Sequence, residues 1–154
     1  MAENHSGGFG WGDEIDPTQE RKERVLLPEG PARFVVTKIE RKREEFGKFG
    51  PQNVAHVHMT VASESDETLE PVELEERLCL HIDMMWKITE FFTAIGQRKH
   101  GDKGKFVPDW AAAEKDGYGR CEITHRDYKN KKGEAKKANN IDKYLPRDEA
   151  GISL

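Results

Sequence analysis

Five lysines surround one glycine near the C-terminal end of the chain, and together they could bind a polyanion. They are Lys129, Lys131, Lys132, Lys136 and Lys137, in the segment HRDYKNKKGEAKKANN. Lysines on a solvated loop suit a phosphate backbone, because each contact releases counterions and needs no fixed geometry. The alternative is a hairpin turn that uses lysine for solubility and to prevent edge-to-edge pairing of strands. From the lysines alone, that alternative is the simpler one.

A second basic segment, ERKREEFGKFG at residues 40–50, adds aromatic side chains to the cations. Proteins that bind single strands combine a positively charged surface with rings on which the bases stack. The predicted phosphate contacts here are Arg41, Arg43 and Lys48. The predicted stacking rings are Phe46, Phe49 and Tyr128, the last of which borders the lysine cluster. Phe106 and Trp110 border a third basic segment, QRKHGDKGKF.

Three histidines raise the question of a metal site. His56 and His58 are two residues apart, so on a strand they share a face, and His81 could reach them from a neighbouring strand. No Asp, Glu or Cys stands at a supporting position in the strand of the pair, and such histidines are typical of a polar sheet face. We therefore predict neither a metal nor another cofactor. Because the chain lacks GxSxG, Walker and HExxH motifs, we also predict no catalytic residues.

The segment GGFGWGDEID near the start combines Phe9 and Trp11 with acidic side chains. It could bind a protein partner as a short linear motif, or compete with nucleic acid for a basic groove. The alternatives are a disordered tail or an extra strand that covers a sheet edge. Phe9 and Trp11 are therefore candidate partner-binding residues, and residues 1–24 are predicted to form a flexible acidic arm.

The apolar pattern between these segments predicts three strands in the first half of the chain. Residues 32–43 and 53–62 alternate between apolar and polar side chains across a loop with two glycines and a proline, which is typical of a hairpin. Residues 72–82 follow an acidic loop and alternate most clearly. Their predicted inner side chains are Val72, Leu74, Leu78, Leu80 and Ile82.

The pattern then changes to a helical period and back. Met85, Ile88, Phe92 and Ile95 form one helical stripe, for which Asp83 is the expected N-cap and Gly96 the expected end. A further one or two helical turns are expected in DWAAAEK. The last two strands are predicted at residues 117–128 and 135–145, where Gly133 can adopt the positive φ of a tight hairpin.

Three strands, a helix and two strands form the chain order of an OB-fold, a five-stranded Greek-key barrel that binds oligonucleotides or oligosaccharides. We predict such a mostly-β, OB-fold-like barrel over residues 25–147, followed by a C-terminal tail at 148–154. Other antiparallel α+β sheets share this order and remain the alternative. In an OB-fold the loops after strands one and four flank the same face, so the two basic segments would converge there.

The composition is compatible with this interpretation. Acidic residues concentrate in segments 1–30 and 63–96 and basic residues in 31–62 and 97–147, so the net charge of −4 does not exclude a polyanion. No apolar run approaches about 20 residues and the start lacks a signal-peptide pattern, which predicts a cytoplasmic protein without a membrane segment. Cys79 and Cys121 have no CxxC partner and are predicted to be thiols in the core.

Four segments in this order resemble a phage and prophage family, the domain-of-unknown-function family numbered 669. They are WGDEID, LLPEGPARFVVTKIER, WKITEFFTAIGQRKHGDKGKFVPDW and GYGRCEITHRDYKNKKGEAKKANNIDKYL. The resemblance covers nearly the whole chain. It implies an OB-fold akin to phage single-stranded DNA-binding proteins and a role near phage recombination and replication genes, but it supplies no functional residues.

Two hypotheses follow. The first is a non-enzymatic, phage-type protein that binds single-stranded DNA during replication or recombination, with RNA as an alternative ligand. The second is a protein-interaction module of a phage recombination cluster that recruits a replication or recombination protein through Phe9 and Trp11. Homo-oligomerisation is compatible with either hypothesis.

Overall fold

The computed structural model describes residues 8–17 and 25–147. Its regular elements are β1 (Gly30–Glu45), η1 (Gly47–Phe49), β2 (Pro51–Ser63), β3 (Val72–Cys79), η2 (Ile82–Met84), α1 (Met85–Ala94), α2 (Trp110–Asp116), β4 (Tyr118–Lys129) and β5 (Ala135–Leu145). The strands and helices lie within a few residues of their predicted positions. In the described ranges no helix is long and apolar enough to cross a membrane. The predictions for residues 1–7, 18–24 and 148–154 lie outside the described residues.

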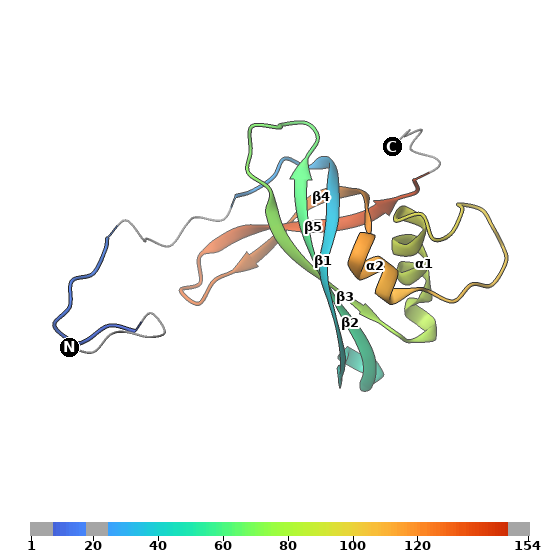
Figure 1. The fold of residues 1–154 in the computed structure, drawn as a ribbon, viewed down its shortest axis with the longest axis horizontal. Coiled ribbons are helices and arrows are strands. Elements are labelled where there is room, and N and C mark those ends of the chain that lie inside the picture. Colours follow the sequence, from blue (N-terminus) through green and yellow to red (C-terminus); the bar gives the residue numbers. More distant parts are fainter. Residues whose placement is uncertain (1–7, 18–24, 148–154) are drawn as a thin grey trace.

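The five strands form one open antiparallel sheet in the order β3-β2-β1-β4-β5 (Figure 1). The central strand β1 pairs with β2 along most of its length and with β4 over its first six residues. The edges are β3 and β5, which do not pair with each other, so the predicted barrel is not closed. The confirmed part of the prediction is a mostly-β protein of five antiparallel strands with one main helix.

Both helices lie on one side of the sheet (Figure 1), and the core lies between them and the strands. We call this side of the sheet the inner face and the opposite side the outer face. An aromatic cluster forms the centre of the core. Phe34 stacks on Phe91 with ring centroids 6.0 Å apart, and Tyr144 meets both rings edge-on at 5.4 and 5.3 Å. Such aromatic pairs stabilise a core beyond the area that they bury.

Side chains connect the two edge strands in place of a hydrogen-bonded ladder. The buried Tyr144 hydroxyl of β5 donates to Glu76 Oε1 of β3 at 2.9 Å, and Lys87 Nζ of α1 lies 2.9 Å from Glu76 Oε2. The Tyr144 backbone N–H also donates to Glu90 of α1 at 2.8 Å. Burial, with the Glu76 carboxylate close by, raises the pKa of Tyr144 well above its usual range, so the hydroxyl keeps its proton. Helix α1 and this cluster therefore join β3 to β5.

A β-bulge at Thr37 interrupts β1. Before the bulge, Phe34 and Val36 face inward and are buried. After it, Ile39 lies opposite the buried Val57 and packs against the core. The inner positions of β1 therefore change from even to odd numbers, as expected when one extra residue is inserted into a strand.

The beginning of α1 differs from the prediction, whereas its end agrees with it. Asp83 lies within η2, and the residue before the helix, Met84, makes no side-chain cap. The expected stripe position Met85 is 59% exposed, so the buried stripe begins at Ile88. Gly96 follows the helix with a φ of 88°, the left-handed conformation that glycine adopts readily.

The two cysteines are free and fully buried, as predicted. Cys121 belongs to the main core, where burial raises its pKa to about 12. Cys79 lies opposite Val54 on the outer face, and this buried pair is outside the main core cluster. Neither thiol is poised to react, because a buried thiol in apolar surroundings stays protonated.

Gly119 allows the end of α1 to approach β4 closely, and its replacement tests this contact. A Cβ at Gly119 would lie 2.7 Å from the Ala94 carbonyl oxygen and 3.1 Å from Cζ of Phe34. Because inserting an atom into a packed core costs about 1–3 kcal/mol, we expect Gly119→Ala to lower the free energy of unfolding by about 2 kcal/mol. Urea denaturation followed by circular dichroism measures the change.

Gly12→Ala is the matched control, since nothing lies within 4 Å of a Cβ at Gly12. This substitution should change the unfolding free energy by no more than about 0.5 kcal/mol. Equal effects of the two substitutions would contradict the close packing of α1 against β4.

Candidate nucleic-acid interface

The bulge in β1 directs two arginines of the predicted site onto the inner face. Arg41 lies opposite Ala55 and Arg43 opposite Asn53 in the pairing with β2. Directly opposed residues of an antiparallel pair share a face, and Ala55 belongs to the core cluster. Arg41 and Arg43 therefore project on the same side of the sheet as α2.

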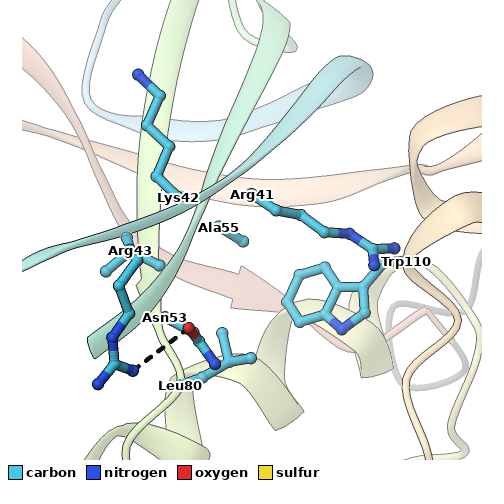
Figure 2. A pocket seen from close by; sticks show the side chains of 8 residues that line it. Arg41, Lys42, Arg43, Asn53, Ala55, Leu80 and Trp110 are labelled. Atoms are coloured by element: carbon cyan, nitrogen blue, oxygen red, sulfur yellow. Dashed lines mark hydrogen bonds between the residues drawn. The ribbon is translucent and has the colours of Figure 1, made fainter. Parts of the chain in front are cut away.

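These arginines line a pocket that we call the basic cleft (Figure 2). It encloses about 430 Å³, within the usual range for ligand pockets. Its lining residues are Arg41, Lys42, Arg43, Asn53, Val54, Ala55, Leu80 and Trp110. Arg43 Nη1 donates to Asn53 Oδ1 across 3.4 Å, and Arg41 extends toward the Trp110 indole (Figure 2). Within the described part of the chain no carboxylate lines this cleft, so its wall is positively charged.

A second pocket, which we call the apolar hollow, adjoins the basic cleft and shares Leu80 and Trp110 with it. It encloses about 320 Å³ and is lined by Leu80, His81, Ile82, Met85, Ile88, Thr89, Phe106, Pro108 and Trp110. Two of its apolar side chains are unusually open to solvent, Ile82 at 74% and Met85 at 59%. The cleft and the hollow together form a surface that is cationic at one end and apolar at the other.

Trp110 lines both pockets, and it is positioned by a contact of its ring and by hydrogen bonds of neighbouring residues in and before α2. Its indole meets the Phe92 ring edge-on at 4.9 Å. Asp109 caps α2, and the Gln97 side-chain amide bonds both backbone groups of Asp109 at 2.8 and 2.9 Å. Glu114 of α2 accepts the Ile39 backbone N–H of β1 at 2.8 Å. A partly exposed ring held in this way is preorganised to stack on a planar ligand.

The two phenylalanines of the predicted site fold back onto the molecule. They lie in residues 46–50, which we call the aromatic turn. Phe46 and Phe49 stack with centroids 6.5 Å apart, and Phe49 also stacks on His81 at 4.1 Å. The Arg77 guanidinium lies 4.8 Å from the centre of the Phe46 ring, and Lys48 Nζ lies 5.5 Å from that of Phe49. Both phenylalanines are half-buried, so part of each ring is already covered by a protein side chain.

The five lysines lie on a well-formed hairpin, residues 129–137, which we call the lysine hairpin. Gly133 has the predicted positive φ, 79°, and the Asn130 side-chain oxygen accepts the backbone N–H groups of Lys132 and Glu134. All five lysines are exposed. Lys137 Nζ lies 3.6 Å from Asp127 Oδ1, which partly compensates its charge. The half-buried ring of Tyr128 has the Arg126 guanidinium 5.9 Å from its centre.

The structure brings together only part of the predicted site. In Figure 1 the aromatic turn lies at the bottom of the molecule and the lysine hairpin at the left, so they do not face each other across a narrow groove. Arg41 and Arg43 instead line one pocket with Trp110, which the sequence predicts only to border a basic loop. The phase shift of the apolar residues from Val36 to Ile39 indicates the face on which the two arginines lie, but it carries no information about Trp110.

The outer face of β1, β2 and β3 carries an alternating chain of histidines and glutamates. His56 Nδ1 lies 2.7 Å from Glu75 and His56 Nε2 lies 2.7 Å from Glu44. His58 Nε2 lies 2.9 Å from Glu40, and its Nδ1 lies 3.6 Å from Glu75. A neutral imidazole has one N–H group, so His56 satisfies both carboxylates only as an imidazolium, unless a carboxylate is protonated.

The pKa shifts agree with this geometry. Burial lowers the pKa of His56, but the hydrogen bonds to Glu75 and Glu44 outweigh it, and the pKa is raised above 6.5. The His56 hydrogen bond, helped by Arg77, lowers the pKa of Glu44 below 4.5 despite some desolvation. The His58 hydrogen bond and Lys38 likewise lower the pKa of Glu40. The outer face is therefore an ion-paired, carboxylate-rich surface that is poorly suited to phosphates.

This chain of side chains places His56 and His58 on one face, as predicted, but His81 stacks on Phe49 and does not join them. Across residues 8–17 and 25–147, no group of three His, Cys, Asp or Glu side chains has an arrangement that could hold a metal ion.

No protein-family model and no curated protein sequence matches the chain.

The His56 pKa predicts how stability depends on pH. Because the folded-state pKa is raised above 6.5, the contribution of His56 is fully present below pH 6.5 and is lost as the pH rises through the folded value. The lowered pKa values of Glu44 and Glu40 give contributions that are present above pH 4.5 and lost on acidification. We expect the urea concentration at the unfolding midpoint to decrease as the pH rises above 6.5, and proton NMR to show a His56 pKa above 6.5.

Glu75→Gln should lower the His56 pKa, because it removes the charge of one hydrogen-bonding carboxylate. Glu122→Gln on β4 removes a carboxylate paired with Lys143 and should leave the His56 pKa unchanged. An unchanged His56 pKa in Glu75→Gln would contradict the ion-paired outer face.

Proposed function

We propose that the protein binds single-stranded nucleic acid in the basic cleft. One observation carries the proposal: the side chains of Arg41 and Arg43 line a pocket that also contains the Trp110 indole and, among the described residues, no carboxylate. Arginine and lysine bind phosphates electrostatically, and an indole provides a platform on which any base can stack. The apolar hollow beside Trp110 extends the platform for a neighbouring base.

The sheet order supports an OB-fold-like scaffold for this site. In an OB-fold β1 pairs with β2 and β4, β2 pairs with β3, β4 pairs with β5, and the barrel is often only partly closed. All four of these pairings are present here, and the seam between β3 and β5 is bridged by Tyr144 and Glu76. The helix between β3 and β4 packs across the same seam.

The charge distribution favours the cleft over the outer face. On an OB-fold, single strands are usually bound on the face of the second and third strands. Here that face carries Glu40, Glu44 and Glu75 in ion pairs with histidine and arginine, which would repel a phosphate backbone. The lysine hairpin offers an additional phosphate contact for a longer strand and is not required for binding in the cleft.

The resemblance to the 669 family supplies the proposed biological setting. A non-enzymatic protein of this kind would bind phage single-stranded DNA during replication or recombination. RNA is the alternative ligand, because nothing in the basic cleft selects for or against a 2′-hydroxyl group.

Charge reversal in the basic cleft tests the proposal. We expect Arg41→Glu/Arg43→Glu to weaken binding of a labelled oligothymidylate at least tenfold at low salt, measured by fluorescence anisotropy. Because each phosphate contact to a single strand adds about 0.7 to the salt slope, the slope of log K against log salt should fall in magnitude by about 1.4. Both side chains are exposed, so the substitutions should not affect folding.

Lys131→Glu/Lys132→Glu is the matched control, with the same charge change on the lysine hairpin. This variant should bind a short oligothymidylate with an affinity within about threefold of the wild type. A larger loss in this control than in the cleft variant would move the binding site to the hairpin. Failure of the wild-type chain to bind single-stranded DNA or RNA at low salt would reject the proposed function.

The second candidate function is a protein-interaction module. The observation in its favour is the solvent-exposed apolar surface around the hollow, where Ile82, Met85 and Trp86 are each more than half exposed. Monomers seldom leave several large apolar side chains exposed next to one another. Met85→Glu should abolish a protein interaction at the hollow, whereas it should reduce nucleic-acid binding only through the added charge.

A further inference from the structure

The segment 8–17 contains a preformed turn that presents a tryptophan. The Asp13 backbone N–H donates to the Gly10 carbonyl at 3.2 Å, and the Asp13 carboxylate accepts the Gly10 N–H in return. Trp11 lies at the tip of this turn and is fully exposed, and Phe9 beside it is 70% exposed. A turn that is already closed by two hydrogen bonds presents its aromatic side chain with little further loss of conformational entropy.

The chemistry of this segment complements the surface formed by the basic cleft and the apolar hollow. Phe9 and Trp11 are followed directly by the acidic residues Asp13, Glu14 and Asp16. The surface offers the apolar hollow on one side of Trp110 and the cations of the cleft on the other. Aromatic anchors in an apolar pocket combined with opposed charges are typical of a specific interface.

The distance between Trp11 and the acidic residues also matches the adjoining positions of the hollow and the cleft. Three residues span at most about 10 Å of backbone, and less in a turn, so a Trp11 side chain in the hollow keeps Glu14 close to the adjoining cleft. The two pockets are contiguous because both are lined by Leu80 and Trp110. The hollow, at about 320 Å³, is large enough for one indole ring.

We propose that the 8–17 segment docks in the cleft and hollow of a second copy of this chain, with Trp11 in the hollow and the acidic residues at Arg41 and Arg43. A second copy is favoured because the chain joins the sheet at Val25 and Leu27, which bond Asn139 of β5. No residue of β5, which the structure describes over its whole length, lines the cleft or the hollow, so this junction lies apart from both pockets. The docked segment covers the surface to which we assign nucleic acid, so it regulates that binding by competition.

The regulatory role rests on the proposed function, but the docking does not. Docking is therefore measured first without nucleic acid. The probe is a fluorescein-labelled peptide of residues 8–17, GFGWGDEIDP, and the receptor is the full chain carrying Phe9→Ser/Trp11→Ser, whose own segment cannot compete. We expect saturable binding by anisotropy. A peptide with Trp11→Ala should bind about thirtyfold more weakly, the size of a hot-spot truncation.

Receptor variants locate the bound peptide. Met85→Glu in the hollow and Arg43→Glu in the cleft should each weaken binding at least tenfold, since Met85 and Arg43 are exposed and line the proposed contact. Lys131→Glu, the same charge change on the lysine hairpin, should leave the affinity unchanged. Equal affinity for all receptors, or no peptide binding, overturns the proposal.

Sedimentation velocity tests the second copy. The wild-type chain should associate as its concentration rises, and the Phe9→Ser/Trp11→Ser chain should remain monomeric. If the wild-type chain stays monomeric at every concentration, docking between copies is rejected, even if the isolated peptide binds.

A final titration with oligothymidylate separates the two proposals. Displacement of the labelled peptide by oligothymidylate supports both docking and competition. If the peptide binds but oligothymidylate neither binds nor displaces it, the proposed function is rejected and the docking stands. If the strand binds and the peptide does not, the docking is rejected and the proposed function stands.

Discussion

The β-bulge at Thr37 is the constraint on which the arrangement of the whole surface depends. One extra residue in β1 reverses the side-chain phase, so Phe34 and Val36 fill the core before it and Arg41 and Arg43 face the same side after it. Without the bulge, a core-forming strand would continue with its glutamates inward and its arginines outward. The Thr37 side chain still connects the bulge to β2, because its hydroxyl group donates to the His58 backbone carbonyl at 3.1 Å.

The same phase reversal decides which charges of ERKREE share a face. Arg41 and Arg43 fall on the inner face, whereas Glu40 and Glu44, with Lys42 between them, fall on the outer face. On the outer face the carboxylates find partners on β2 and β3 in His56, His58 and Arg77. On the inner face the arginines share a pocket with an indole and a leucine, which cannot neutralise them. A positively charged pocket wall therefore arises in a protein with a net charge of −4.

The sequence was sufficient to predict the elements because their signals are local. Strand alternation, the Gly96 helix end and the Gly133 turn depend on residues within one turn or one hairpin, and they are observed. The exceptions are Leu80 and Ile82, which were predicted on the inner face of the third strand but lie beyond the end of β3 and are exposed. The prediction that Asp83 caps α1 was wrong, because Asp83 lies within the 3-10 helix η2 that precedes α1. The His81 side chain caps η2 by accepting the Asp83 backbone N–H.

The arrangement of the candidate site could not be predicted in the same way. Phe46 and Phe49 were expected to be open platforms, but whether a ring in a turn folds back depends on His81 and Arg77 of another segment. Barrel closure likewise depends on whether two edge strands come within hydrogen-bonding distance, which neither strand encodes alone. The sequence does contain a local signal of the bulge, because the apolar positions change from even to odd numbers between Val36 and Ile39. A single change of this kind also occurs where a strand simply ends, so it does not by itself identify a bulge.

The open seam explains why the candidate site lies at the far end of the β1–β2 ribbon. Between β3 and β5 the structure uses a buried hydroxyl, a carboxylate and α1 to hold the edges, so substituting Tyr144 or Glu76 would leave polar groups without partners in the core. The cleft depends on none of these groups. Trp110 is positioned by its edge-on contact with Phe92 and by the hydrogen bonds of Gln97 to Asp109 and of Glu114 to Ile39. Because Ala113 of α2 is buried in the same core cluster, the stacking platform is fixed to the rigid part of the fold, which reduces the entropy lost on binding.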